Sequence, residues 1–217
     1  MDLDLIKKCS LFKGLKDNEF NYALNFFDAR EAKYEKGNFL NRISCPLLAF
    51  GFVLEGTVQV YMDDIDGQQM IMANVNAGDT FGESLCYLEE DAPVYICAVT
   101  NCKILWLNPS RLKSYEYLKN SLSSKLSNNF TAMLAKRTLE MNNRIQILSK
   151  LTLRSKLITF FSQYVSTYGN KFTLPFDRSN MAVYLGTDRT ALSRELSNMK
   201  KEGIIDFNKN KFSLIEH

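Results

Sequence analysis

The chain has 217 residues, of which 46% are hydrophobic, 24% charged and 12% aromatic, and its formal net charge is +3. This length suffices for one large or two modest domains, and the composition excludes a disordered or collagen-like chain. No segment approaches the roughly 20 uninterrupted apolar residues of a membrane span, and the N-terminus lacks the apolar centre of a signal peptide. We therefore expect no membrane association and a cytoplasmic location.

The two halves of the chain carry opposite charge. Residues 1–108 hold 9 Lys and Arg against 16 Asp and Glu, a balance of −7, whereas residues 109–217 hold 18 against 8, a balance of +10. Because nucleic acid is a polyanion, the second half is the one suited to approach it. A solvated basic face has the same composition, so charge alone leaves both interpretations open.

Cysteine and histidine limit the chemistry that the chain can perform. Five cysteines stand at positions 9, 45, 86, 97 and 102 without any Cys-x-x-Cys pair, which predicts reduced thiols rather than a disulfide framework or a zinc site. The only histidine is His217, the last residue. A histidine-based metal or catalytic site would have to use that terminus, so we expect no metal site, no catalytic residues and no enzyme activity.

The N-terminal half changes from helical to strand pattern along its length. Residues 1–36 predict short helices, because apolar residues recur every three to five positions and Gly14 interrupts them. From residue 37 to 107 short apolar runs separated by turn signals predict strands at 48–54, 58–62, 69–73, 94–99 and 103–107. Short strands at near-even spacing are typical of an antiparallel barrel or β-roll.

A long helix is predicted after Asn108-Pro109, because no Gly or Pro follows until Gly169. Its apolar residues form one stripe, which consists of Leu118, Leu122, Leu126, Phe130, Leu134, Met141, Ile145 and Leu148. At 1.5 Å per residue this helix is about 45 Å long, which exceeds a domain of this size. We therefore expect the stripe to pair with a second copy of the chain rather than lie only on its own barrel.

The C-terminal stretch predicts two helices joined by a tight turn and followed by a hairpin. After a helix at about 152–168 and a strand near 172–174, helices are expected at 177–185 and 188–202, and strands near 204–207 and 212–215. Ala182 is small enough for two helices to cross closely, and Gly186 permits a left-handed turn between them. This is the pattern of a helix-turn-helix with a wing, although an ordinary packed helical hairpin shares part of it.

The outward face of the second of these helices is polar and basic. It carries Arg189, Thr190, Ser193 and Arg194. Such a face enters the major groove of DNA, where Arg binds guanine O6 and N7 with two hydrogen bonds. The sequence therefore predicts a DNA-binding helix.

These segments carry a resemblance to a known family. Residues 187–196 and 201–205 resemble the winged-helix signature of the cyclic-AMP receptor protein and fumarate-nitrate regulator (Crp/Fnr) family of bacterial transcription factors, and residues 11–15, 56–61 and 78–83 are similar to its β-roll effector domain. The resemblance covers nearly the whole chain. It implies an α+β fold with an antiparallel, jelly-roll-like β-roll of the cyclic-nucleotide-binding type at 1–110 for effector sensing, a long dimerisation helix at 111–148 and a winged helix-turn-helix at 149–217.

The resemblance also implies a function and partners. It implies a homodimer that binds a palindromic operator in double-stranded DNA and recruits or blocks RNA polymerase. Arg189, Thr190 and Arg194 match the base-reading positions of the family. Thr187 and Ser193 match positions that contact phosphate or cap the helix.

The sensor departs from the pattern of the cyclic-nucleotide binders. From Gly82 to Val99 there is no Arg or Lys, and Pro93 and Val94 stand where the family places the arginine that pairs with the cyclic phosphate. Met141 and Asn142 stand where the long helix of the cyclic-nucleotide binders carries two residues with hydroxyl side chains. We therefore expect an effector other than cyclic AMP. An iron-sulfur cluster is not expected either, because Cys9 is the only cysteine in the first 44 residues.

What remains is a candidate pocket for an unknown small-molecule effector, lined by Phe81, Gly82, Glu83, Ser84, Tyr87, Tyr95, Met141 and Asn142. Its aromatic and apolar members suit a small apolar or aromatic molecule, but the same side chains also suit a core. A redox switch at a cysteine and haem on a cysteine thiolate stay open. The alternatives are a constitutive DNA binder with a vestigial sensor and a cupin-type enzyme, which would need histidines that residues 1–216 lack.

Overall fold

The computed structural model describes residues 3–63, 69–174 and 177–215. The chain forms two compact units, Met1–Ala135 and Lys136–His217. Each unit has its own hydrophobic core.

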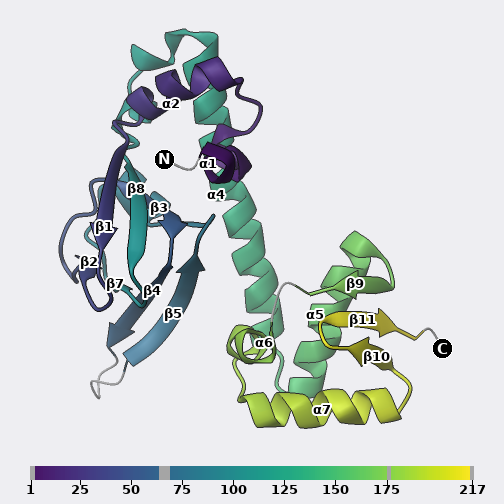
Figure 1. The fold of residues 1–217 in the computed structure, drawn as a ribbon. Coiled ribbons are helices and arrows are strands. Elements are labelled where there is room, and N and C mark those ends of the chain that lie inside the picture. The colour runs from purple at the N-terminus through teal and green to yellow at the C-terminus, as the bar shows by residue number, and fades with distance from the viewer. Residues whose placement is uncertain (1–2, 64–68, 175–176, 216–217) are drawn as a thin grey trace. The chain divides into compact units, whose positions relative to one another are not determined.

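The first unit begins with short helical segments and continues in strands (Figure 1). The helical segments are α1 (Leu3–Lys8), η1 (Ser10–Phe12), η2 (Asp17–Glu19) and α2 (Phe20–Phe26). The strands are β1 (Arg30–Tyr34), β2 (Phe39–Asn41), β3 (Phe50–Glu55), β4 (Thr57–Asp63), β5 (Gln69–Asn76), β6 (Thr80–Phe81), β7 (Tyr95–Ala98) and β8 (Cys102–Leu107), with α3 (Glu83–Leu88) between β6 and β7. They form two antiparallel sheets in the orders β1-β8-β3-β6 and β2-β7-β4-β5.

Strand β3 lies at the centre of the first unit because both of its faces are buried. Phe50, Phe52 and Leu54 point into the core that the helical segments complete, whereas Val53 belongs to the core between the two sheets. Alternate residues of a strand face opposite sides. A strand with two buried faces therefore reads as a continuous apolar run, which is the pattern of 50–54 in the sequence.

The five strands predicted for this half are all present, within three residues at each end. The expectation of helices up to residue 36 is wrong beyond α2, because residues 30–34 form β1. This strand has mostly exposed, charged side chains and pairs with β8 at the margin of its sheet. Without an alternating apolar pattern, nothing in the sequence marks it as a strand.

The long helix α4 (Ser121–Leu148) starts later than predicted. Residues 110–120 instead form two 3₁₀ turns, η3 (Ser110–Lys113) and η4 (Tyr117–Lys119). Asn120 has extended backbone angles, and its side-chain oxygen accepts a hydrogen bond of 2.8 Å from the backbone N–H of Ser123. This is an N-cap, which fixes the start of the helix at Ser121.

The apolar stripe of α4 is divided between two environments. Leu126 and Phe130 are buried in the core of the first unit, and Leu134 packs against that core. Leu122 is partly buried. Leu118, predicted as the first residue of the stripe, lies in η4 rather than in α4 and also packs against the core. The expectation that the whole stripe meets a second chain is therefore corrected for Leu126 and Phe130, because the same chain already covers them. Met141, Ile145 and Leu148 lie at the surface of the second unit, 60%, 59% and 39% exposed.

The second unit contains the last turns of α4 and a compact α+β fold (Figure 1). Its further elements are α5 (Leu153–Tyr168), β9 (Lys171–Thr173), α6 (Arg178–Leu185), α7 (Arg189–Lys201), β10 (Ile205–Asn208) and β11 (Lys211–Leu214). The strands form an antiparallel sheet in the order β10-β11-β9. The predicted helices and strands are all present within two residues. The expected α+β class, a β-roll followed by a long helix and a winged helix-turn-helix, is confirmed.

We predict that Leu126→Ala lowers the free energy of unfolding of the first unit by about 2–5 kcal/mol, because it leaves a cavity in a closed core. Urea unfolding followed by fluorescence of Trp106, the only tryptophan, measures this loss. Leu48→Ala is the matched control, since Leu48 is 73% exposed in the same unit and its truncation should change the stability by less than about 0.5 kcal/mol. Equal losses for the two variants would contradict the packing of α4 described above.

Candidate functional site

The turn between α6 and α7 is built by local interactions. The side chain of Asp177 caps α6 by accepting a hydrogen bond of 2.7 Å from the backbone N–H of Asn180. Gly186 ends the helix in the left-handed region (φ 60°), and the N–H of Thr187 reaches back to the carbonyl of Ala182 at 3.0 Å. Such a C-terminal motif favours glycine at this position. The turn predicted at Gly186 is therefore present.

Helix α7 buries one face and leaves the opposite face in solvent. Asp188 caps its N-terminus, and Leu192, Leu196 and Met199, spaced at four and three residues, lie in the core of the second unit. The 3.6-residue period then turns the remaining positions outward. All four predicted residues of this face, Arg189, Thr190, Ser193 and Arg194, are exposed, and Thr187 is partly exposed.

Hydrogen bonds and ion pairs distinguish the members of this face. The Ser193 hydroxyl donates to the carbonyl of Arg189 at 2.9 Å, so its remaining capacity is to accept. Among the residues that the structure describes, no hydrogen bond or ion pair engages the guanidinium groups of Arg189 and Arg194. Glu195, next to this face, lies 3.7 Å from Arg154 of α5, which also pairs with Glu202. This ion pair accounts for a carboxylate where an apolar residue would otherwise pack.

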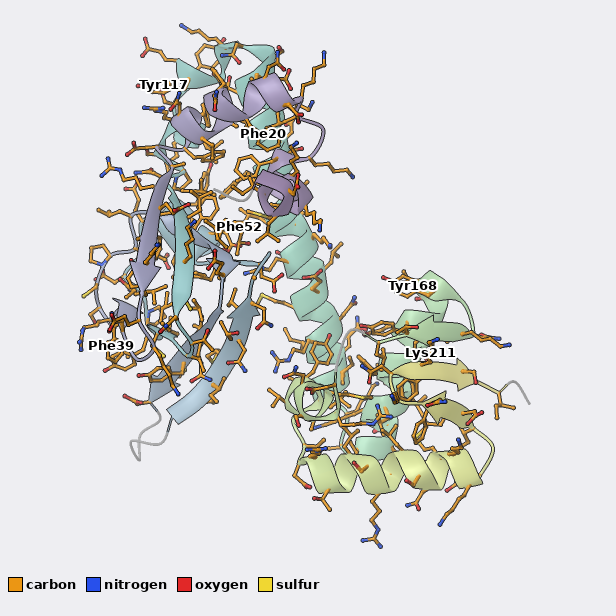
Figure 2. The ribbon with its side chains drawn as sticks, viewed as in Figure 1. Phe20, Phe39, Phe52, Tyr117, Tyr168 and Lys211 are labelled. Atoms are coloured by element: carbon orange, nitrogen blue, oxygen red, sulfur yellow. The ribbon has the colours of Figure 1, made fainter. Side chains whose placement is uncertain are left out.

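The hairpin formed by β10 and β11, which we call the wing, adds lysines that the motif analysis did not assign. Asn208 pairs with Lys211, so the two-residue turn between the strands is Lys209-Asn210. Lys209 and Lys211 are exposed, and Figure 2 shows Lys211 on the wing. The polar, basic composition of the turn was the sequence signal for these two lysines. The position of the wing beside α6 and α7 is known only from the fold.

Within the first unit, the predicted effector residues lie in different surroundings. Phe81 is buried in the core between the sheets and contacts Trp106, with 5.5 Å between ring centroids. Tyr87 of α3 lies 5.5 Å from the ring of Phe130. Ser84 is exposed, and Met141 and Asn142 are exposed residues of the second unit.

The placement of Tyr95 in that pocket is wrong. In the register of β4 and β7, Tyr95 stands opposite Tyr61, whereas its neighbour Ile96 belongs to the core. Alternation therefore turns Tyr95 to the outer face of the sheet. There its ring stacks on Tyr61 at 5.2 Å and lies 5.7 Å from Phe39.

An apolar side chain covers the turn where a cyclic phosphate would need polar partners. Gly82 begins α3 at φ 84°, and a Cβ placed on it would lie 2.3 Å from Cδ2 of Leu47. Leu47 is buried. The adjacent carboxylate of Glu83 is also buried and accepts a hydrogen bond from the hydroxyl of Thr80. An anion bound beside this turn would therefore meet the apolar side chain of Leu47.

The cysteines differ in their suitability for redox chemistry. Burial raises the pKa of Cys9 to about 11 and that of Cys86 to about 12, so both are thiols at neutral pH. Cys102 is also buried, Cys97 is half-buried and Cys45 is exposed. In the part of the chain that the structure describes, no three His, Cys, Asp or Glu side chains are grouped to hold a metal ion. His217 lies outside the described residues.

No described helix is both long and apolar enough to span a lipid bilayer.

Comparisons with known proteins agree with this architecture. The family called "Cyclic nucleotide-binding domain" matches residues 31–115, and the family called "Crp-like helix-turn-helix domain" matches residues 148–216. The chain is 25% identical to the cyclic AMP receptor protein of Thermus thermophilus over 203 residues, which cover 92% of this chain and 89% of that protein. It is 19% identical to the cAMP-activated global transcriptional regulator Vfr of Pseudomonas aeruginosa, with coverage of 71% and 74%.

Among solved structures, the catabolite activator protein of Thermus thermophilus is similar to this chain, with a TM-score of 0.52 and 21% identity. The match covers 95% of this chain and 94% of that one, and it supports the fold. A cyclic-nucleotide-binding-type β-roll joined to a Crp-like helix-turn-helix defines a class of DNA-binding transcription regulators. The chain belongs to the Crp/Fnr family of these regulators.

We predict a division of labour on α7. Arg189→Ala should cost about 1–3 kcal/mol on the operator and relax base preference at one position of each half-site, because a base contact is lost. Ser193→Ala should weaken specific and random DNA by similar factors, because a phosphate contact carries no sequence information. Its salt dependence should hardly change, since a neutral hydroxyl releases no counterion.

Titration of operator and random DNA at several salt concentrations measures both variants. If Arg189→Ala reduces both affinities equally, Arg189 contacts the backbone and the assignment of base reading is incorrect.

Proposed function

We propose that the protein is a homodimeric transcription regulator that binds a palindromic operator under control of a small molecule other than cyclic AMP. The observation that carries the proposal is the exposed face of α7, with its two arginines, beside the lysine-bearing wing. We also propose the division into a sensor (1–110), a dimerisation helix (111–148) and a DNA reader (149–217). Two readers related by a two-fold axis would contact half-sites about 34 Å apart, where the dimer would recruit or block RNA polymerase.

The uncovered part of the α4 stripe supports the dimer. Met141, Ile145 and Leu148 are spaced at four and three residues and therefore share one helix face. Burial of these apolar side chains away from water would stabilise the structure that covers them. A second copy of the same face covers them symmetrically, as in a two-helix coiled coil.

Replacing Met141 and Ile145 together with Lys places charge in this seam and should convert the dimer to monomer in sedimentation experiments. Leu139→Lys is the matched control, because Leu139 is 64% exposed on the same helix but lies off the stripe. The control should remain a dimer. A double variant that also remains a dimer of unchanged stability means that the stripe does not form the interface.

The apolar surroundings of Gly82 support an effector other than cyclic AMP. Leu47 covers the turn, and residues 82–99 contain no Arg or Lys. The two curated relatives described above are named for cyclic AMP, so this chain would differ from them in its ligand. A pairing cation is the element that a buried phosphate requires.

Calorimetry with millimolar cyclic AMP should therefore give no saturable heat, and operator affinity should not change. The same protein sample is titrated with operator DNA to establish that it is active. A dissociation constant in the low micromolar range for cyclic AMP would falsify this expectation and would mean that another residue supplies the cation.

A vestigial sensor is a second candidate, and the packing around Gly51 favours it. A Cβ at Gly51 would lie 2.1 Å from the ring of Phe81, so this ring occupies the space directly above β3. Under this alternative the purified protein binds its operator fully without any added molecule. A regulated sensor instead gives an affinity that changes with a ligand, and a ligand of the native state also raises the melting temperature.

A further inference from the structure

The wing contacts the rest of the second unit through its pairing with β9, through buried Ile205 and Phe212, and through the aromatic ring of Phe207. Phe207 of β10 stands opposite Phe212 of β11, and their ring centroids are 5.5 Å apart. Phe212 stacks on Phe172 of β9 and contacts Phe161 of α5. Phe207 therefore packs the outer strand against the aromatic core, to which Ile205 of the same strand also belongs.

Two cations, one from each helix of the pair, contact Phe207. The guanidinium of Arg178, at the start of α6, lies 5.0 Å from the ring centroids of both Phe207 and Phe212. The ammonium of Lys200, near the end of α7, lies 5.1 Å from the Phe207 ring. These distances are within the range of cation–π attraction.

Both cations also bind the wing by hydrogen bonds. Arg178 donates to the carbonyl of Lys209, in the wing turn, at 2.9 Å. Lys200 donates to the carbonyl of Phe207 at 3.2 Å and pairs with Asp206 at 2.5 Å, which lowers the pKa of that carboxyl. Burial lowers the pKa of the Arg178 guanidinium.

We infer that Arg178, Phe207 and Lys200 form a cation clamp that positions the wing against the two helices, so that Lys209 and Lys211 can contact DNA phosphates. Lys209 adopts a positive φ of 52°, an unfavourable conformation for a lysine, and its carbonyl is the one that Arg178 holds. Arg178 and Lys200 are then positioning residues. The inference rests on the proposed binding of DNA by the wing as well as by α7.

The clamp predicts that a residue without a phosphate contact changes the salt dependence of DNA binding. The variant used for comparison, called the wing variant, carries Lys209→Gln and Lys211→Gln together in the full-length protein. Its affinity for operator and random DNA alike should fall on the order of tenfold, and the slope of log affinity against log salt concentration should fall by about two units per reader. If the wing variant binds as the original protein does, the proposed wing contacts fail, whatever the clamp does.

Arg178→Leu and Phe207→Leu test the clamp itself. Each should reproduce the lower slope of the wing variant, and adding Arg178→Leu to the wing variant should change the slope no further. Phe207 carries no charge, so a slope lowered by Phe207→Leu arises through cations that Phe207 positions, and the combination of Arg178→Leu with the wing variant shows whether Arg178 is one of them. Lys8→Ala, which removes an exposed charge of α1, should leave the slope unchanged.

Two outcomes would overturn the clamp. One is a further fall of about one unit when Arg178→Leu is added to the wing variant, because Arg178 would then contact phosphate itself. The other is an unchanged slope for a folded Phe207→Leu protein. Melting curves establish whether each variant is folded. If the Arg178→Leu protein does not fold, Lys200→Met is used in its place.

Discussion

Helix α4 contributes buried side chains to the cores of both units, and the packing of each unit depends on this one helix. Leu126 and Phe130 complete the core of the first unit, and Ile147 is fully buried in the core of the second. Because the helix has 3.6 residues per turn, a different set of its side chains faces each core. The face that neither core covers, at Met141 and Ile145, is the one on which the proposed dimer depends.

The helix-turn-helix was predictable because its determinants are local. Asp177, Gly186 and Asp188 set the ends of α6 and α7 through contacts within five residues, and the apolar period of α7 fixes which face is exposed. A sequence displays such signals directly. The wing strands follow in the same way from short apolar runs around a polar turn.

The sensor was less predictable because its determinants lie far apart in the sequence. Leu47 reaches Gly82, and Phe81 fills the space above Gly51, across more than 25 residues in each case. The outward direction of Tyr95 depends on the register of β7 with β4. A shift of one residue would turn every side chain of the strand to the other face, so an aromatic residue in a strand does not by itself indicate a pocket.

The turn between α6 and α7 also receives contacts from outside the motif. Arg144 of α4 lies 3.4 Å from the carbonyls of Val183 and Tyr184, and Lys156 of α5 donates to the carbonyl of Leu185 at 3.2 Å. These carbonyls lie in the last turn of α6, where the negative end of the helix dipole favours cations. Arg144 and Lys156 therefore connect α4 and α5 to the C-terminal end of α6, which leads directly into the turn before α7.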